Sequence, residues 1–293
     1  MSSNLLPPES CINGSIGVVI VGATGNMGKE AVKAVLAQPD MTLLGAVGRR
    51  YAGEDAALIA GEDTPCGVTL VSSLVELLSS LKTSGALEPY EHWVGIELTN
   101  PTTVMEHTNS LVQAGFRPVI GTSGVEEAQQ KTLNRVLTSA SLGGAVIPNF
   151  AIGAVLMMRF AKEAAQYFDN VEIVELHHNK KLDAPSGTAH HTALSLSEHH
   201  PHPFNAALVK EAETITGARG AEFPNGVRVH SVRLPGLVAH QEVLLASEGQ
   251  LLTIRHDSFN RQCFMPGVLR AIRGVTTHSG LKVGLEHYLQ GKE

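Results

Sequence analysis

The feature that most constrains the fold of this chain is a set of spaced glycines between a strand-like and a helix-like segment. Residues 16–21 are apolar and mostly β-branched, which is typical of a buried parallel strand. Glycines follow at positions 22, 25 and 28, and residues 29–38 repeat apolar side chains with helical spacing. A strand, a glycine turn and a helix in this order are the setting in which such glycines indicate a dinucleotide site. The sequence therefore predicts an α/β chain that begins with a Rossmann-like, doubly wound parallel sheet.

The glycine turn itself is the first candidate cofactor site. Its residues are Gly22, Ala23, Thr24, Gly25, Asn26 and Met27. The spacing is GxxGxxG rather than GxGxxG, because Thr24 occupies the place of the middle glycine. A tight strand-to-helix turn that binds no ligand is the alternative interpretation.

Two arginines after the second strand-like segment bear on the choice of cofactor. Residues 42–47 form that segment, and Arg49 and Arg50 follow it. An acidic residue at this place would bind the ribose 2′-hydroxyl of NADH, whereas arginine accommodates the 2′-phosphate of NADPH. The sequence therefore predicts that NADPH is preferred and leaves the use of NADH open. The alternative is a pair of solvated arginines at a strand end.

The remainder of the first half continues the alternation of strands and helices. Further strands are expected at 92–98, 118–120 and 144–147, with helices at 72–81, 102–114 and 129–140. These strands end in Thr99-Asn100-Pro101, Gly121-Thr122-Ser123 and Pro148-Asn149-Phe150-Ala151. Because ligands of open parallel sheets lie beyond the carboxyl ends of the strands, the first two ends should line the nicotinamide half of the cofactor. We expect a dinucleotide-binding domain at residues 1–150, with its core at 16–148.

Residues 175–189 carry the densest group of chemically active side chains. His177, His178, Lys180 and Lys181 stand together, and the turn at 183–188 follows them. Pro185 and Gly187 shape this turn, which runs into a helix-like segment, and the start of a helix is a ready anion site. A proton-handling group beside an anion site suits a small dicarboxylate substrate. A basic surface loop is the alternative.

The second half of the chain has a different pattern. A long helix is expected at 152–168, another that closes at 192–200, and strands at 171–176, 227–234, 242–246 and 250–257. Together they predict an α+β domain with a mixed or antiparallel sheet at 151–267, serving substrate binding and oligomerisation. Helices at 268–273 and 281–289 would form a C-terminal helical segment, residues 268–293, that packs back on the first domain.

Composition excludes several classes of function. The 293 residues carry a net charge of −6 with a pI near 6.2, so a nucleic-acid-binding surface is not expected. Cys11, Cys66 and Cys263 lack CxxC spacing, and the chain shows neither a signal peptide nor an apolar run of the ~20 residues that span a bilayer. We expect a cytoplasmic protein with free thiols that does not bind membranes. The histidines at 190, 191, 199, 200 and 202 complete no ligand pattern, so no metal is expected.

With both ends of the chain considered, the sequence resembles the dihydrodipicolinate reductase family, also called 4-hydroxy-tetrahydrodipicolinate reductases. The long family signature, Glu-x-His-His-x-x-Lys-x-Asp-Ala-Pro-Ser-Gly-Thr-Ala, is present without a break at residues 175–189. Shorter matches occur at 21–28, 121–124, 148–153 and 230–242. The resemblance implies NAD(P)H-dependent reduction of 4-hydroxy-tetrahydrodipicolinate to tetrahydrodipicolinate, a step of the diaminopimelate pathway of lysine biosynthesis.

The resemblance also implies roles for individual residues. His177 would be the acid/base and Lys181 the proton donor, while the substrate carboxylates would be held by His178, Ser186, Gly187 and Thr188. Residues 22–27, 121–123 and 148–151 would contact the nucleotide. Relatives are commonly homotetramers assembled through the sheet of the second domain, and the same is expected here.

Two other functions remain open from the sequence. One is another two-domain enzyme, such as an amino-acid or semialdehyde dehydrogenase, although the three cysteines lack the setting of a semialdehyde nucleophile. The other is a non-catalytic, NADPH-sensing regulator, which would have no reason to carry the group from His177 to Thr188.

Overall fold

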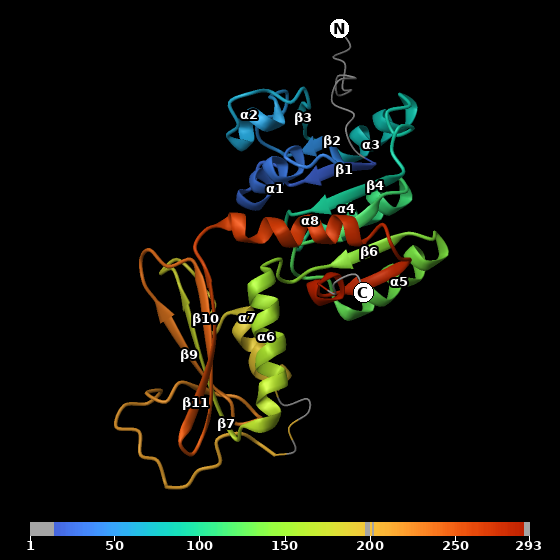
Figure 1. Cartoon of the computed structure of the whole chain (residues 1–293). Helices are drawn as coiled ribbons and strands as arrows, with labels where there is room; N and C mark the ends of the chain where they lie inside the picture. The colour runs from blue at the N-terminus through green and yellow to red at the C-terminus, as the bar shows by residue number, and fades with distance from the viewer. Residues whose placement is uncertain (1–14, 197–199, 201, 290–293) are drawn as a thin grey trace. The chain divides into compact units, whose positions relative to one another are not determined.

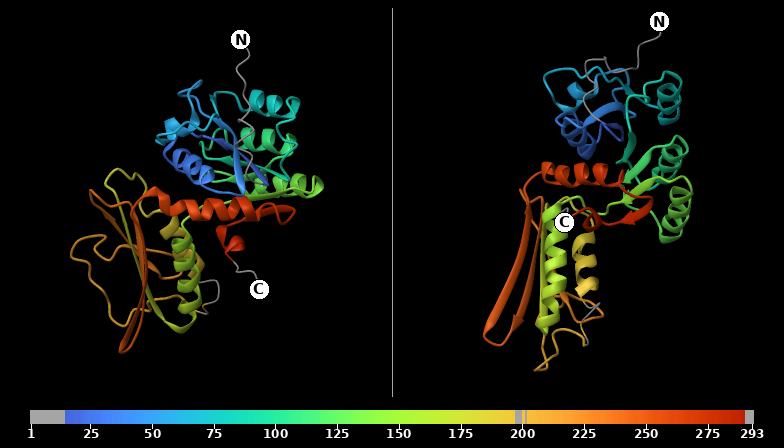
Figure 2. Two further views of the ribbon diagram at one scale, coloured as in Figure 1. Left: turned by 45° about the horizontal axis from the view of Figure 1, so that its top comes forward. Right: turned by 45° about the vertical axis from the view of Figure 1, so that its right-hand side comes forward.

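The computed structural model describes residues 15–196, 200 and 202–289, and these fall into two compact units (Figures 1 and 2). The first unit comprises the described residues up to Phe150 and those from Phe264 onward, and the second is Ala151–Cys263. Cys11, His199 and nearly all of the polar N-terminal segment lie outside the described residues.

A seven-stranded parallel sheet forms the centre of the first unit. Its order is β12-β6-β5-β4-β1-β2-β3, and every neighbouring pair is parallel. The strands are β1 (Ile16–Val21), β2 (Met41–Val47), β3 (Leu70–Val71), β4 (His92–Glu97), β5 (Arg117–Ile120), β6 (Gly143–Val146) and β12 (Gly280–Val283). All residues of β1 and β2 are buried, which explains their unbroken apolar sequence. The predicted doubly wound parallel sheet is confirmed.

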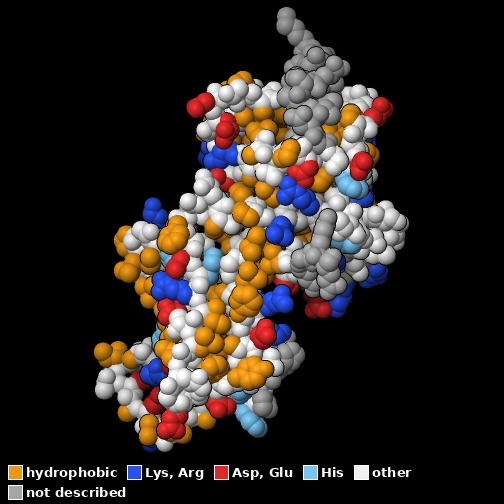
Figure 3. Space-filling view, in the orientation of Figure 1, with side chains coloured by type: hydrophobic (Ala, Val, Ile, Leu, Met, Phe, Trp, Pro, Cys, Tyr) orange, Lys and Arg blue, Asp and Glu red, His pale blue; other side chains and the backbone are white. Residues whose placement is uncertain are grey.

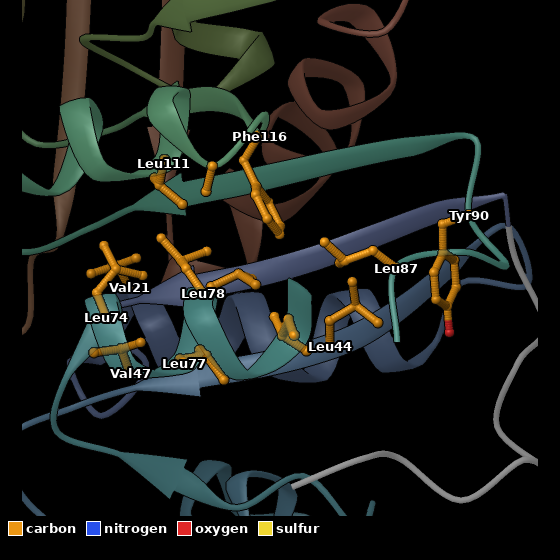
Figure 4. Packing of buried hydrophobic residues seen from close by; sticks show 13 residues of the cluster. Val21, Leu44, Val47, Leu74, Leu77, Leu78, Leu87, Tyr90, Leu111 and Phe116 are labelled. Atoms are coloured by element: carbon orange, nitrogen blue, oxygen red, sulfur yellow. The ribbon is translucent and has the colours of Figure 1, made fainter. Parts of the chain in front are cut away.

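Helices cover this sheet and complete its core. They are α1 (Asn26–Leu36), α2 (Ala56–Ala60), α3 (Leu74–Thr83), α4 (Val104–Gln113), α5 (Glu127–Ser139) and α8 (Met265–Gly274). Figure 4 shows leucines of α3 packed on Val21, Leu44 and Val47 of the sheet. Burying a side chain of this size contributes roughly 1.5–3 kcal/mol. The core therefore holds the strand ends, and the turns that follow them, in fixed positions.

The second unit is a five-stranded mixed sheet with helices on one face (Figure 2). The order is β11-β10-β7-β9-β8, in which only β7 and β9 are parallel. The strands are β7 (Asn170–His177), β8 (Ala221–Glu222), β9 (Arg228–Arg233), β10 (Ala239–Ser247) and β11 (Gln250–Ser258). The helical segments are α6 (Ile152–Ala164), η2 (Ala165–Tyr167), α7 (Gly187–Ser195) and η4 (Arg261–Phe264), the last of which crosses into the first unit. Ala161 of α6 and Ala193 of α7 pack with Ile173 and Val243 of the sheet.

The helix predicted at 281–289 is wrong. The segment contains strand β12, which pairs in parallel with β6, followed by the short 3-10 helix η5 (Leu285–Tyr288). Gly284, with φ +105°, separates the two. Pairing at the edge of the sheet supplies β12 with backbone hydrogen bonds, and this tertiary contact outweighs the helical spacing of the sequence. The helix expected to close at 192–200 instead spans Gly187–Ser195, while residues 197–199 are not described.

Candidate functional site

A cleft of about 790 Å³ opens in the first unit beside the carboxyl ends of β1, β2 and β4. Its lining includes Gly22, Thr24 and Gly25 from the glycine turn, and Arg49 and Arg50 from the turn after β2. Ligands of doubly wound sheets bind in this position. Thr99 and Asn100, which follow β4, line it as well. The cleft is thus a candidate dinucleotide site that contains seven of the residues singled out in the sequence.

The glycine turn is shaped so that the backbone can approach a ligand. Gly22 has φ +90°, and a Cβ placed there would lie 2.5 Å from the carbonyl oxygen of Leu98. A Cβ on Gly28 would lie 2.1 Å from the carbonyl oxygen of Gly22, so only glycine lets α1 pack this close to the turn. The first-turn N–H groups of a helix lack intrahelical partners, and those of Asn26 and Met27 stand at the start of α1. These residues fit a dinucleotide pyrophosphate.

Thr24, which stands where GxGxxG has its middle glycine, makes a packing contact that a glycine lacks the side chain to make. Its side chain lies against Gly48, where an added Cβ would be 2.6 Å from Thr24 Cγ2. The threonine therefore packs the glycine turn on the turn after β2 while it lines the cleft. Ala23 is buried, so only its backbone is suited to contact a nucleotide.

Arg49 and Arg50 are exposed at the mouth of this cleft. Their turn is tied down by β3, since Gly48 N–H donates to the Val71 carbonyl and Gly53 N–H to the Leu70 carbonyl, both at 2.9 Å. The sequence did not predict β3, which is only two residues long. Its effect is to fix the backbone of the turn that carries the two arginines beside the cleft.

The two other predicted nucleotide contacts lie beside the cleft. Residues 121–123 and 148–151 are not among its described lining, but a Cβ on Gly121 would lie within 2.7 Å of both Phe150 and Leu98 side chains. Leu98 itself lines the cleft. The hydroxyl of Thr122 is buried without a hydrogen-bond partner among the described residues. A ligand group would satisfy this hydroxyl.

The sequence analysis missed a buried acid at the base of the cleft. Glu97, the last residue of β4, is fully buried, and its Oε1 accepts from the hydroxyl of Thr99 and lies 3.2 Å from His107 Nδ1. Thr103, the N-cap of α4, and His107, one turn into that helix, line the cleft with Thr99. A glutamate in an otherwise apolar strand was the available signal. Its contact with His107 orients the other ring nitrogen of that histidine.

In the second unit, His177 is held by a buried carboxylate. His177 Nδ1 lies 2.5 Å from Glu175 Oε2, and both residues are on β7. The side chain of Glu175 has no exposed surface. Burial opposes its ionisation, but hydrogen bonds from His177, Arg233 and Ser231 outweigh burial and lower the pKa of Glu175 to about 2. Because this carboxylate is ionised, it accepts from Nδ1–H, so that Nε2 is the ring nitrogen of His177 that does not face Glu175.

Lys181 lies in the turn that follows β7. Its ammonium donates to Asp183 Oδ1 at 2.8 Å and to Oδ2 at 2.9 Å. This hydrogen bond lowers the pKa of the Asp183 carboxyl below its usual value. An ammonium has three protons, so two bonds to Asp183 leave one for a ligand.

The residues of the predicted anion site lie at the start of α7. Ser186 is the N-cap, with its hydroxyl accepting from Ala189 N–H at 3.2 Å, and its own N–H donates to Glu175 Oε1 at 3.2 Å. Gly187 and Thr188 occupy the first turn of the helix. Ser186 therefore joins the anion site to the carboxylate that holds His177. His178 Nδ1 is buried without a hydrogen-bond partner among the described residues, which suits a nitrogen that awaits a ligand.

The described histidines among residues 190–202 are not gathered into a metal site. Within the described part of the chain, no group of three or more His, Cys, Asp or Glu is placed to bind a metal ion. His190 packs edge-on against Phe223, and His200 stacks on Phe204 at 4.1 Å. Cys66 and Cys263 are free thiols. Among the residues that the structure describes, no helix is long and apolar enough to cross a membrane.

Comparisons with known proteins match both units. A family model described as dihydrodipicolinate reductase, N-terminus, matches residues 16–150, and the corresponding C-terminus model matches residues 153–289. A 4-hydroxy-tetrahydrodipicolinate reductase from Nostoc sp. is 46% identical over 276 residues, 94% of this chain and 98% of that protein. The enzyme of the same name from Rippkaea orientalis is 48% identical with the same coverage. The solved structure of dipicolinate-bound dihydrodipicolinate reductase from Paenisporosarcina sp. TG-14 matches with a TM-score of 0.79 and 43% identity, covering 94% of this chain and 99% of that chain.

Proposed function

This chain belongs to the dihydrodipicolinate reductase family, and we propose which of its residues carry the reaction and select the cofactor. It is an NAD(P)H-dependent oxidoreductase that reduces 4-hydroxy-tetrahydrodipicolinate to tetrahydrodipicolinate in the diaminopimelate pathway of lysine biosynthesis. Because the family models match both halves, the other dehydrogenases and the NADPH-sensing regulator are not retained as alternatives.

The observation that supports the catalytic roles best is the contact between His177 and the buried carboxylate of Glu175. The 4-hydroxyl group of the substrate leaves as water, which makes the ring conjugated, and the reduced nicotinamide, when bound, supplies a hydride to that ring. The neighbouring ring atom must then gain a proton, and Lys181 donates it from the ammonium proton that Asp183 leaves free. His177, with Nδ1 bound to Glu175, acts through Nε2 as the acid/base. The proposed reaction needs no metal.

Anion recognition by the start of α7 would align the substrate. Gly187 and Thr188 present first-turn N–H groups to one carboxylate, and His178 offers its buried nitrogen to the substrate as well. Ser186 shapes this site from the N-cap. Holding both carboxylates converts binding energy into orientation of the reacting carbon. The proposed nucleotide contacts remain residues 22–27, 121–123 and 148–151.

We expect Arg49→Ala to raise the KM for NADPH about 10- to 100-fold while leaving the KM for NADH nearly unchanged. One charge-assisted hydrogen bond to the 2′-phosphate, worth roughly 1.5–3 kcal/mol, would be lost. The loss of reduced-nicotinamide absorbance is measured with substrate generated from pyruvate and aspartate semialdehyde by the preceding enzyme. Arg50→Ala tested alongside apportions the effect between the two arginines.

Arg135→Ala removes an exposed cation from α5 of the same unit and serves as the matched control. It should leave the KM for both cofactors unchanged. Equal rates of the unmodified enzyme with NADPH and NADH would keep the reaction and discard the proposed role of the arginines.

We propose that the chain assembles as a homotetramer through the sheet face of the second unit that none of the described helices covers. Val174 and Leu244 lie on this face, because their neighbours in β7 and β10 are buried on the helix side. Figure 3 shows that apolar side chains are also exposed along α6, on the helix side of this unit.

We also propose that the protein is cytoplasmic.

The proposed homotetramer can be tested by measuring the molecular mass of the protein in solution. Leu244→Glu places an unpaired charge at the centre of the uncovered face, so it should lower the mass measured by light scattering to that of smaller species. Leu58→Glu, on the exposed side of α2, should leave the mass unchanged. An unaltered mass for the Leu244 variant would show that this face is not the subunit contact.

A further inference from the structure

The guanidinium group of Arg233 contacts Glu175, the partner of His177, and the backbone of Asp183, the partner of Lys181. Arg233 ends β9, and its side chain is mostly buried, with 20% exposed. Nη1 donates to Glu175 Oε2 at 2.9 Å, and Nη2 donates to Glu175 Oε1 at 2.7 Å. Nη2 also donates to the backbone carbonyl of Asp183 at 2.8 Å. The three bonds join a buried carboxylate of the sheet to an exposed turn.

Toward His177, Arg233 determines where the Glu175 carboxylate lies. The same oxygen, Oε2, accepts from Arg233 Nη1 and from His177 Nδ1. A two-pronged guanidinium–carboxylate contact defines both the position and the plane of the carboxylate. The direction of the His177 ring, and hence of its Nε2, is therefore set by Arg233 through Glu175.

Toward Lys181, Arg233 fixes the turn that supplies the partner of the ammonium. The side chain of Asp183 is 59% exposed, and an ion pair this open holds its partners weakly by itself. The bond from Arg233 Nη2 to the Asp183 carbonyl ties the backbone of that residue to the sheet. The Asp183 carboxylate, and with it the Lys181 ammonium, thus acquires a defined place relative to His177.

We propose that Arg233 is a positioning residue that holds the His177 imidazole and the Lys181 ammonium in register with each other. It does so through Glu175 on one side and the Asp183 backbone on the other, without touching the substrate. This inference rests on the proposed function, because it presumes that His177 and Lys181 handle the protons. A displacement of about 1 Å at such groups can cost 10²-fold in rate.

The test compares Arg233→Met and Arg233→Lys with the unmodified enzyme under saturating NADPH. Arg233→Met should lower kcat about 10²-fold with little change in the KM for the substrate. Arg233→Lys keeps the positive charge beside Glu175 but cannot make the two-pronged contact, so its kcat should fall roughly tenfold. If Arg233→Met does not fold, the lysine variant still carries the test.

Arg273→Met is the matched control. Arg273 also binds a carboxylate at two points, with both bonds to Asp40 at 2.7 Å, and makes a third bond to Gln38, but it belongs to the first unit and is not in the lining of the cleft there. Its loss should affect stability without changing kcat. A similar fall in kcat for both methionine variants, or an Arg233→Met enzyme with normal kcat, would overturn the proposal.

A double-mutant cycle separates this inference from the proposed function. If Arg233 acts through the two proton-handling groups, Arg233→Met should cost far less in a Lys181→Met or His177→Gln background than in the unmodified enzyme. Full additivity would overturn the positioning role. Normal kcat in both single variants, Lys181→Met and His177→Gln, would instead refute the proposed catalytic roles on which the inference rests.

Discussion

Replacing Lys181 with methionine is expected to lower kcat by a factor of ~10²–10⁴, which is the usual contribution of a positioned proton donor. Methionine keeps the length of the side chain and removes the ammonium. The KM for the substrate should rise as well, because a cation that attracts a dicarboxylate is lost. Initial rates at saturating NADPH over a range of substrate concentrations separate the two effects.

The adjacent lysine provides the control for this experiment. Lys180 is exposed, whereas Lys181 is partly buried and paired with Asp183. Lys180→Met should therefore keep its kcat, and His177→Gln should lower it. A normal kcat in the Lys181 variant would exclude Lys181 as donor and leave His177 as the source of the proton.

The parallel sheet could be predicted because local sequence and tertiary environment agree there. All residues of β1 and β2 are buried, so nearly every position in these strands requires an apolar side chain. The resulting apolar runs can be recognised in the sequence. The glycines at 22, 25 and 28 likewise meet a local need, since the turn between β1 and α1 leaves no room for a Cβ at Gly22 or Gly28. Apolar strands and glycine turns can therefore be predicted without knowledge of contacts between distant residues.

The errors and omissions involve contacts between distant residues. Strand β12 depends on pairing with β6, more than 130 residues earlier in the chain, and β3 depends on pairing with β2. Four residues with ambiguous spacing cannot reveal a partner at that distance.

The same limit applies within the candidate site. The signature at residues 175–189 indicates roles for His177 and Lys181, but none for Glu175. Its role depends on Arg233, 58 residues away in sequence. Glu97 could not be predicted for the same reason, because it meets His107 only when α4 packs beside β4. The sequence therefore indicates the groups proposed to react, whereas the groups that hold them are apparent only from the structure.

Replacing Glu175 with glutamine should impair both catalysis and folding. The two oxygens of Glu175 accept from His177, Arg233 and the Ser186 N–H, so an amide NH₂ in either orientation faces a donor. We expect kcat to fall about 10²-fold as His177 loses its fixed direction. We also expect a loss of about 1–3 kcal/mol of unfolding free energy, because a buried polar contact is broken. Glu127→Gln, at an exposed ion pair on α5, is the control and should have little effect.

The loss of stability should depend on pH in a direction that follows from the pKa of Glu175. Hydrogen bonds from His177, Arg233 and Ser231 overcome burial and hold this pKa at about 2 in the folded protein, below the ordinary value of 4.5. A depressed pKa means that the carboxylate stabilises the fold fully above pH 4.5 and loses this contribution as the pH falls toward 2. The difference in unfolding free energy between the unmodified protein and Glu175→Gln should therefore be constant near neutral pH and shrink between pH 4.5 and 2. Urea unfolding at a series of pH values measures it, and a difference that stays constant throughout this range would mean that the ionised carboxylate does not stabilise the fold.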